Sequence, residues 1–359
     1  MAKDAELGPL QKLMDDPAVS EIMVNGPSEV FVEKRGKKII TDVKFSSEEE
    51  VLSLTQKLFS ARSKRIDSDV PYADVCLENG TRVNAIISPI SRFGISVTFR
   101  KFSEEIKSLD DLVKLGTINE RAKELLVASI KGKINILFSG GTAVGKTTLL
   151  QMLSAYFAPE ERVITIEDAA ELKMEQENVI SLETRTPDRE GKGGVSLRDL
   201  IRNSLRMAPD RLVIGEVRGA EAIDMMQAMA TGHKGTIGII HGNSARDVIA
   251  RLETMVLMSG INLPLWEIRK MISATINMVV HVDKMKDGVR RVTHITEIRG
   301  LDREEIQFND LFIFETKKIE PDGKIIGELK PAIRYFPVFF QQFQKLGLIS
   351  DKIFSNEQN

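Results

Sequence analysis

A glycine-rich stretch near the middle of the chain constrains the fold more than any other feature. Residues 138–150 read FSGGTAVGKTTLL, which contains the spacing G-x-x-x-x-G-K-T. The apolar run KINIL (133–137) precedes this stretch, and TTLLQMLSAYF (147–157) follows it with helical apolar spacing. The sequence therefore predicts a buried strand, a glycine turn and a helix in direct succession, which is the setting of a phosphate-binding loop.

The position of the loop between a strand and a helix predicts what its residues bind. Glycines let backbone N–H groups turn toward phosphate oxygens, and the positive end of the following helix adds to the field there. Lys146 is expected to reach the terminal phosphates of a nucleotide, and the Thr147 hydroxyl is expected to ligate Mg²⁺. The candidate nucleotide-binding residues are Gly140, Gly141, Thr142, Ala143, Val144, Gly145, Lys146, Thr147 and Thr148.

The composition limits the class of protein. With 359 residues the chain is long enough for two domains with ordinary cores. Its 50 Lys and Arg nearly balance its 52 Asp and Glu, so no overall field draws it to nucleic acid or to an anionic membrane. Cys76 is the only cysteine, which excludes a disulfide framework and a four-cysteine zinc site within one chain. No apolar run approaches about 18 residues and the N-terminus lacks a signal-peptide core, so we expect a cytosolic protein.

The organisation of the chain changes near residue 100. Over 1–98, strand-like runs alternate with a helical stretch at 47–63 that has Ser47 as its N-cap, which predicts a small α/β domain. A charged stretch marks an expected linker over 99–111. Over 112–359, strands and helices alternate in the manner of a mainly parallel sheet, and this part carries the phosphate loop.

Two further apolar strands are predicted to end in acidic residues. RVITIEDAAEL (162–172) reaches Glu167, and DRLVIGEVRGAEA (210–222) reaches Glu216. In open α/β sheets the ligand sits at the carboxyl ends of the strands, so both carboxylates are predicted to converge on Mg²⁺ and the attacking water. Either acid alone would be interpreted as a surface residue or a helix cap, but two such strand ends after a phosphate loop favour function.

A histidine-containing segment completes the set of motifs. TGHKGTIGIIHGNSARD (231–247) holds two histidines eight residues apart. No third ligand lies at a suitable spacing, and TIGII between them is typical of a buried strand, which disfavours a metal site. His241, at the predicted strand end, could hydrogen-bond the terminal phosphate or its coordinating groups, although a structural role is the simpler interpretation of a lone histidine.

The order of these motifs resembles that of the type II/type IV secretion ATPase superfamily, with its Walker A, Asp box, Walker B with glutamate, and His box. The resemblance covers nearly the whole chain. Four further segments look most like the Tad/Flp pilus assembly ATPase branch, called CpaF. They are DDPAVSEIMVNGPSEVFVEKRGK (15–37), NGTRVNAIISPI (79–90), RLETMVLMSGINLPL (251–265) and DGVRRVTHITEI (287–298).

The resemblance implies a fold and an assembly. The fold is α/β, with a small N-terminal α/β (PAS-like) domain over 1–98 and a RecA-like P-loop ATPase domain with a mainly parallel sheet and a C-terminal extension over 112–359. The assembly is a homo-hexameric ring that works with inner-membrane pilus platform proteins of the TadB/TadC type. The chain is then expected to hydrolyse Mg²⁺-ATP in the cytoplasm, peripheral to the inner face of the inner membrane, without a nucleic-acid partner. The hydrolysis is expected to power assembly of Tad/Flp pili, and retraction stays open as a second direction of movement.

The resemblance also implies roles for individual residues. Glu167 is the candidate base or water-positioning group, Glu216 is the Walker B acid that helps Thr147 to hold Mg²⁺, and His241 is the His-box histidine. In relatives, arginines from the N-terminal domain complete the site. The matching positions in this sequence are Arg82, Arg92 and Arg100.

Two positions depart from the pattern of the resembling family. Ala143 stands where glycine is usual, and if this position needs a positive φ, alanine costs about 1 kcal/mol or more there. Nucleotide affinity or loop closure would then differ. Ile239 stands where the His box usually has threonine, which removes a hydroxyl near the phosphates.

The residues disfavour other classes of nucleotide-binding protein. A regulatory GTPase needs an N-K-x-D motif and an ABC-type ATPase an LSGGQ signature after the loop, and both are missing. A nucleic-acid translocase lacks a stacking platform beside a basic groove, because the chain has one Trp and three Tyr with near-neutral charge. Two alternatives stay open: a type IV secretion ATPase that drives substrate export, and a nucleotide-gated scaffold with weak hydrolysis.

Overall fold

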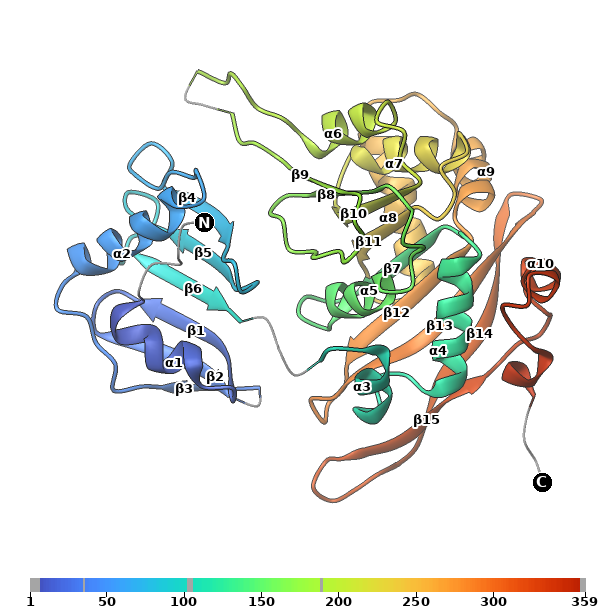
Figure 1. The fold of residues 1–359 in the computed structure, drawn as a ribbon, viewed down its shortest axis with the longest axis horizontal. Coiled ribbons are helices and arrows are strands. Elements are labelled where there is room, and N and C mark those ends of the chain that lie inside the picture. Colours follow the sequence, from blue (N-terminus) through green and yellow to red (C-terminus); the bar gives the residue numbers. More distant parts are fainter. Residues whose placement is uncertain (1–6, 35, 102–105, 188–189, 356–359) are drawn as a thin grey trace. The chain divides into compact units, whose positions relative to one another are not determined.

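Two units of packed structure make up the chain in a computed structural model (Figure 1). The first unit comprises Met1–Glu105 and the second comprises Ile106–Asn359. The structure describes residues 7–34, 36–101, 106–187 and 190–355. Part of the expected linker, residues 102–105, lies outside the described residues.

The first unit is built on a six-stranded antiparallel sheet with the strand order β3-β2-β1-β6-β5-β4. Alternate side chains of the strands, such as Ile22 and Val24 on β1, are buried and pack against the apolar side of helix α2. As predicted, Ser47 is the N-cap of α2, and its hydroxyl accepts a hydrogen bond from the Glu50 N–H. The elements are η1 (Gly8–Leu10), α1 (Gln11–Asp15), β1 (Val19–Asn25), β2 (Glu29–Lys34), β3 (Lys37–Ile40), α2 (Glu48–Ser60), β4 (Tyr72–Cys76), β5 (Arg82–Ile86) and β6 (Ser96–Arg100).

The second unit is built on a nine-stranded sheet with the order β15-β14-β13-β12-β7-β11-β10-β8-β9. Every pairing from β12 across to β9 is parallel, and the pairings from β12 to β15 are antiparallel. The predicted α/β fold with a mainly parallel sheet is confirmed. The helices are α3 (Leu109–Lys114), α4 (Glu120–Lys131), α5 (Lys146–Ser154), α6 (Leu197–Ser204), α7 (Glu221–Ala230), α8 (Ala245–Met258), α9 (Leu265–Thr275), α10 (Phe340–Lys345) and η2 (Asp351–Phe354). The strands are β7 (Ile136–Gly140), β8 (Val163–Glu167), β9 (Val179–Glu183), β10 (Arg211–Val217), β11 (Ile237–His241), β12 (Met278–Lys284), β13 (Arg290–Asp302), β14 (Glu305–Ile319) and β15 (Ile325–Pro331).

Helices cover both faces of this sheet (Figure 1). Helices α3, α4, α5 and α10 contribute to one core cluster, and α6, α7, α8 and α9 contribute to another. Phe138 on β7 belongs to the first cluster and its neighbour Leu137 to the second, because successive side chains of a strand point to opposite faces. Burial on both faces is why the central strands have nearly continuous apolar sequences.

The strand before the phosphate loop begins later than the sequence predicted. The run 133–137 predicts a strand, whereas β7 spans Ile136–Gly140. Gly132 is the C-cap of α4 and Lys133 has a φ of 52°, so these residues turn the chain before the strand begins. The strand then continues to Gly140, the first residue of the glycine loop, with every residue buried.

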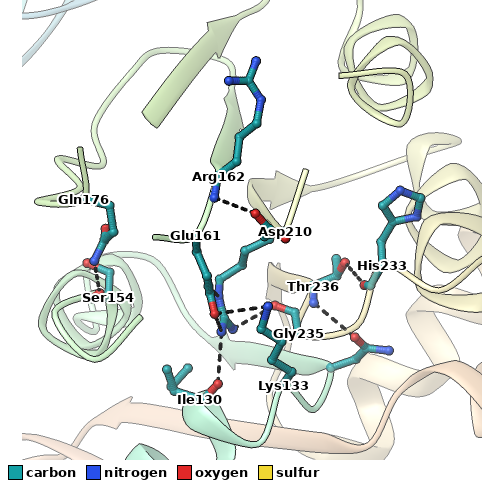
Figure 2. Close-up of polar contacts among 12 residues, drawn as sticks. Ile130, Lys133, Ser154, Glu161, Arg162, Gln176, Asp210, His233, Gly235 and Thr236 are labelled. Carbon is teal, nitrogen blue, oxygen red and sulfur yellow. Dashed lines mark hydrogen bonds and ion pairs between the residues drawn. The ribbon is translucent and has the colours of Figure 1, made fainter. Parts of the chain in front are cut away.

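A buried ion pair lies at the amino ends of the parallel strands. The Arg211 guanidinium, 1% exposed, bonds both carboxylate oxygens of Glu161 at 2.6 and 3.1 Å. It also donates to the carbonyl oxygens of Ile130 and Gly235. Lys133 adds a second cation 3.2 Å from Glu161, and Figure 2 shows Lys133 and Glu161 close together, near Ile130 and Gly235. The carboxylate therefore neutralises a cation that no solvent reaches.

Removing the buried carboxylate is expected to destabilise the second unit. The Glu161→Ala substitution leaves the Arg211 guanidinium buried without its counter-charge, which typically costs about 3–5 kcal/mol. Denaturant unfolding monitored by the fluorescence of Trp266, the only tryptophan, would report on this unit. The matched control is Glu160→Ala at the exposed neighbouring position, which is expected to change stability by less than about 0.5 kcal/mol. Equal unfolding midpoints for the two variants would contradict the prediction.

Candidate functional site

The candidate site lies where neighbouring parallel strands end. His241, the last residue of β11, is the register partner of Gly140, the last residue of β7. Strand β10 pairs in parallel with β11, and β8 pairs in parallel with β10. Since these strands run in the same direction, their carboxyl ends meet at one edge of the sheet, which is where ligands bind in open α/β folds. The predicted phosphate loop, His241, Glu216 and Glu167 all lie at or near this edge.

The phosphate loop turns the chain between β7 and α5. Gly140 has a φ of 146°, and a Cβ atom there would lie 2.1 Å from the Val282 carbonyl oxygen, so only glycine fits. Gly145 is the N-cap of α5 and has a φ of 98°. Lys146 is buried, and its Nζ donates to the carbonyl oxygens of Gly140 at 3.0 Å and Gly141 at 2.5 Å. The ammonium group therefore lies against the inside of the loop.

The remaining loop residues divide between core and surface. Val144 is 4% exposed and belongs to the core cluster beneath the loop. Gly141 and Thr142 are exposed, whereas Thr147 and Thr148 are half-buried in the first turn of α5, at the positive end of its dipole. Thr147 thus lies at the helix end where the sequence predicts that its hydroxyl ligates Mg²⁺.

Ala143 has a positive φ of 62°. This is the left-handed region, in which the Cβ of an L residue costs about 1–2 kcal/mol. The sequence left open whether position 143 is strained, and the structure answers that it is. The Ala143 carbonyl accepts a hydrogen bond of 2.9 Å from Nε of Arg290. The other departure, Ile239, is buried in the core cluster beneath the loop, so its side chain contributes to packing.

Glu216 and His241 form a contact pair. Nε2 of His241 lies 2.9 Å from Oε1 of Glu216, while Arg218 bonds Oε2 at 2.5 Å. Burial raises the pKa of Glu216, but the hydrogen bond from Arg218 and nearby positive charge outweigh it, so the pKa lies below its usual value. Burial and the charge of Lys146 lower the pKa of His241. At neutral pH the pair is therefore a carboxylate in close contact with an uncharged imidazole.

Glu167 lies deeper than the other acid. Its side chain is 3% exposed, and its carboxylate accepts hydrogen bonds of 3.2–3.3 Å from the N–H groups of Glu171 and Leu172. It also lies against Gly215, where a Cβ would approach its Cγ within 2.7 Å. Gly215, the residue that precedes Glu216, thus leaves space for the Glu167 side chain. The carboxylate fixes the loop that follows β8, and it is held at the same edge as the phosphate loop.

The three candidate arginines belong to the first unit. Arg82 on β5 and Arg100 on β6 are register partners, so the structure brings these two together. Arg100 also lies 3.6 Å from Glu21. Arg92 is exposed in the connection between β5 and β6. All three are therefore carried by one hairpin, with two of them on the sheet.

Three residues near the phosphate loop were missed by sequence reasoning. Arg218 bonds Glu216, Arg290 bonds the Ala143 carbonyl, and His281 Nδ1 lies 2.8 Å from the Ser139 hydroxyl. His281 is buried on β12 beside β7, and burial lowers its pKa. The segment DGVRR contains Arg290, but nothing in its sequence indicates contact with a loop about 150 residues away, because the strand order that joins them is non-local.

The structure limits the kinds of metal site. Among the described residues, no group of three or more His, Cys, Asp or Glu could hold a metal ion. Mg²⁺ does not need one, because it is usually bound through one or two protein oxygens together with substrate phosphates and waters. The Thr147 hydroxyl and the ionised Glu216 are oxygen donors of that kind. Within the described part of the chain, no helix is long and apolar enough to cross a membrane.

The second unit combines a mainly parallel α/β sheet with a phosphate-loop sequence at the carboxyl ends of its strands, and a smaller unit precedes it in the chain. Comparison with known proteins identifies the family. Residues 3–307 match the family described as type II/IV secretion system protein. The type IV secretion system protein VirB11 of Brucella suis is 32% identical over 324 residues, covering 81% of this chain and 88% of that protein. The chain belongs to the type II/IV secretion system protein family and is an ATPase.

Solved structures share the fold. The ATPase DotB of Legionella pneumophila has a TM-score of 0.58 at 19% identity, over 82% of this chain and 80% of that chain. The pilus retraction motor PilT, solved with bound ADP, has a TM-score of 0.56 at 18% identity, over 94% and 87%. Both likenesses concern the arrangement of the chain, in which an N-terminal domain precedes a mainly parallel sheet.

Relieving the strain at position 143 is expected to stabilise the second unit. In Ala143→Gly the relief of about 1–2 kcal/mol exceeds the added entropy of the unfolded chain, about 0.4–1 kcal/mol, so the free energy of unfolding should rise. The matched control is Ala155→Gly, at an exposed position with a φ of −60°, where the same substitution is expected to lower it. Denaturant unfolding measures the free energy of unfolding of each variant. A loss of stability in Ala143→Gly equal to that in Ala155→Gly would show that position 143 carries no strain.

Proposed function

We propose that this protein is a Mg²⁺-dependent ATP-hydrolysing motor that works as a homo-hexameric ring on the cytoplasmic face of the inner membrane and drives assembly of a Tad/Flp type IV pilus. The observation that carries the catalytic part is the contact between Glu216 and His241 at the edge of the sheet where the phosphate loop and Lys146 lie. Each motif that the sequence singles out contributes one group to this edge of the sheet, in the order phosphate loop, Glu167, Glu216, His241.

The residues divide the work of hydrolysis. Loop N–H groups and Lys146 hold the terminal phosphates and offset their charge. Thr147 and Glu216 would hold Mg²⁺, which supplies Lewis-acid stabilisation of negative charge on the phosphoryl group. Glu167 orients the attacking water or accepts its proton, and the neutral His241 lies against Glu216 and limits where that carboxylate can move.

Two observations favour a secretion or pilus motor over other uses of ATP. The chain belongs to the type II/IV secretion system protein family, whose member VirB11 it resembles over most of its length. PilT, which shares the fold, is described as a pilus retraction motor. The Tad/Flp assignment rests on the four CpaF-like sequence segments and implies platform partners of the TadB/TadC type. Crosslinking in the native host, followed by identification of the membrane partner, distinguishes this assignment from an export ATPase of type IV secretion.

The assignment of Glu167 leads to a specific expectation. Glu167→Gln keeps an oxygen that accepts from the Glu171 and Leu172 N–H groups, so the loop after β8 should stay in place. The base is lost, which typically lowers turnover by about 10²- to 10⁴-fold with ATP binding retained. Steady-state ATPase assays and nucleotide titrations measure the two effects. Full turnover in this variant would refute the role of Glu167, and an inactive parent in every assembly state would favour the nucleotide-gated scaffold.

The arginines of the first unit are expected to link activity to assembly. An arginine that stabilises charge on the transferred phosphoryl group is worth about 10³- to 10⁵-fold in rate. Turnover should therefore depend on protein concentration and on the mass of the assembly, and Arg82→Ala, Arg92→Ala or Arg100→Ala should lower it. Arg65→Ala, at an exposed arginine of the same unit, is the control. A fully active monomer that is indifferent to all three substitutions would falsify the motor mechanism and leave only the nucleotide site.

A further inference from the structure

The phosphate loop is supported from outside by the turn between β12 and β13. Arg290, the first residue of β13, donates its Nε–H to the Ala143 carbonyl at 2.9 Å. The aliphatic part of the same side chain lies over Gly145, since a Cβ on Gly145 would be 3.4 Å from the Arg290 Cδ. One side chain therefore spans the strained residue and the N-cap of α5.

The turn that carries Arg290 is itself held in several ways. Its ends are joined by the Met285 N–H to Val289 carbonyl hydrogen bond. Asp287 forms two hydrogen bonds of 2.8 Å with Arg291 and accepts the N–H groups of Val289 and Ile325. The Arg291 guanidinium lowers the pKa of Asp287 to about 2, so this carboxylate stays ionised. The turn therefore holds the backbone of Arg290 in a fixed position.

Arg290 contacts the loop at its strained residue, Ala143. A left-handed conformation at position 143 is unfavourable for alanine by itself, so a free loop with this sequence would relax toward negative φ. Relaxation would turn the neighbouring N–H groups away from the concave side that receives phosphate. The hydrogen bond to the Ala143 carbonyl is made with Ala143 in the left-handed conformation. A change of φ at Ala143 re-orients the peptide group that follows it, so the bond opposes that relaxation.

We infer that Arg290 is a positioning residue that keeps the phosphate loop in its nucleotide-binding conformation and offsets the strain of Ala143. The inference rests on the proposed function, because it takes a nucleotide diphosphate or triphosphate as the ligand of the loop. Arg290 acts through the loop backbone and does not contact the ligand. If the loop binds phosphate as proposed, this contact accounts for how it does so with alanine at position 143.

The experiment is a double-mutant cycle read by ADP affinity. Arg290→Ala is expected to weaken ADP binding about threefold to tenfold, the range for one lost hydrogen bond. In the Ala143→Gly background the left-handed conformation has no Cβ penalty, so Arg290→Ala should change affinity by less than about twofold. The double variant should thus recover most of the affinity that Arg290→Ala loses. Lys286→Ala, an exposed cation of the same turn, controls for loss of charge.

Three outcomes would overturn the inference or its basis. If Arg290→Ala and Lys286→Ala bind ADP with equal affinity, Arg290 has no specific role in positioning the loop. Equal losses from Arg290→Ala in both backgrounds would mean that it contacts the nucleotide directly. A parent chain that binds ADP no better than Lys146→Ala would instead overturn the proposed function.

A second measurement needs no nucleotide. Hydrogen exchange of the amides at 141–147 is expected to accelerate in Arg290→Ala and to return toward the parent rate when Ala143→Gly is added. This readout tests the positioning role even if the nucleotide site is wrong, because it follows the loop conformation alone. Unchanged exchange in Arg290→Ala would refute the role.

Discussion

The parallel register of β7, β11, β10 and β8 is the constraint on which the candidate site depends. It brings the ends of these strands to one edge although they are far apart in sequence. Glu216 and His241 can touch only because neighbouring strands end at nearly the same height. The buried pair of Arg211 and Glu161 lies at the opposite edge, where it joins the amino ends of the strands. The candidate site and the buried ion pair thus lie at opposite edges of one sheet.

The predictable part of the site consists of local features. The glycine spacing, the apolar runs and the acid at the end of each run are properties of short segments, and parallel α/β folds place the ends of such runs together. As this reasoning predicted, Glu167, Glu216 and His241 lie at or near the ends of strands, and their roles in catalysis stay predictions. It also gave Ser47 as the N-cap of α2, because an N-cap bond joins residues three apart.

The unpredictable part consists of contacts between distant segments. The start of β7 depends on how α4 ends, and the Lys133 turn is not visible in an apolar pattern. The sequence indicated that Glu167 and Glu216 share an edge, but not that Glu167 is buried over Gly215 with its carboxylate bound to backbone N–H groups. Arg290 and His281 reach the loop only through the order β13-β12-β7, which no local pattern specifies.

The conformation of the phosphate loop illustrates how local and non-local terms combine. Glycine is required at position 140 because the β12 backbone passes too close for a Cβ, so tertiary structure selects that residue. At position 143 the local preference of alanine opposes the observed φ, and the surroundings overcome it: Val144 is anchored in the core on one side and Arg290 holds the carbonyl on the other. A loop held from both sides has less freedom to lose when phosphate binds than one that relies on glycine flexibility. Rigidity supplied by tertiary contacts can therefore replace a glycine in a phosphate loop, provided that the supporting strands are themselves fixed.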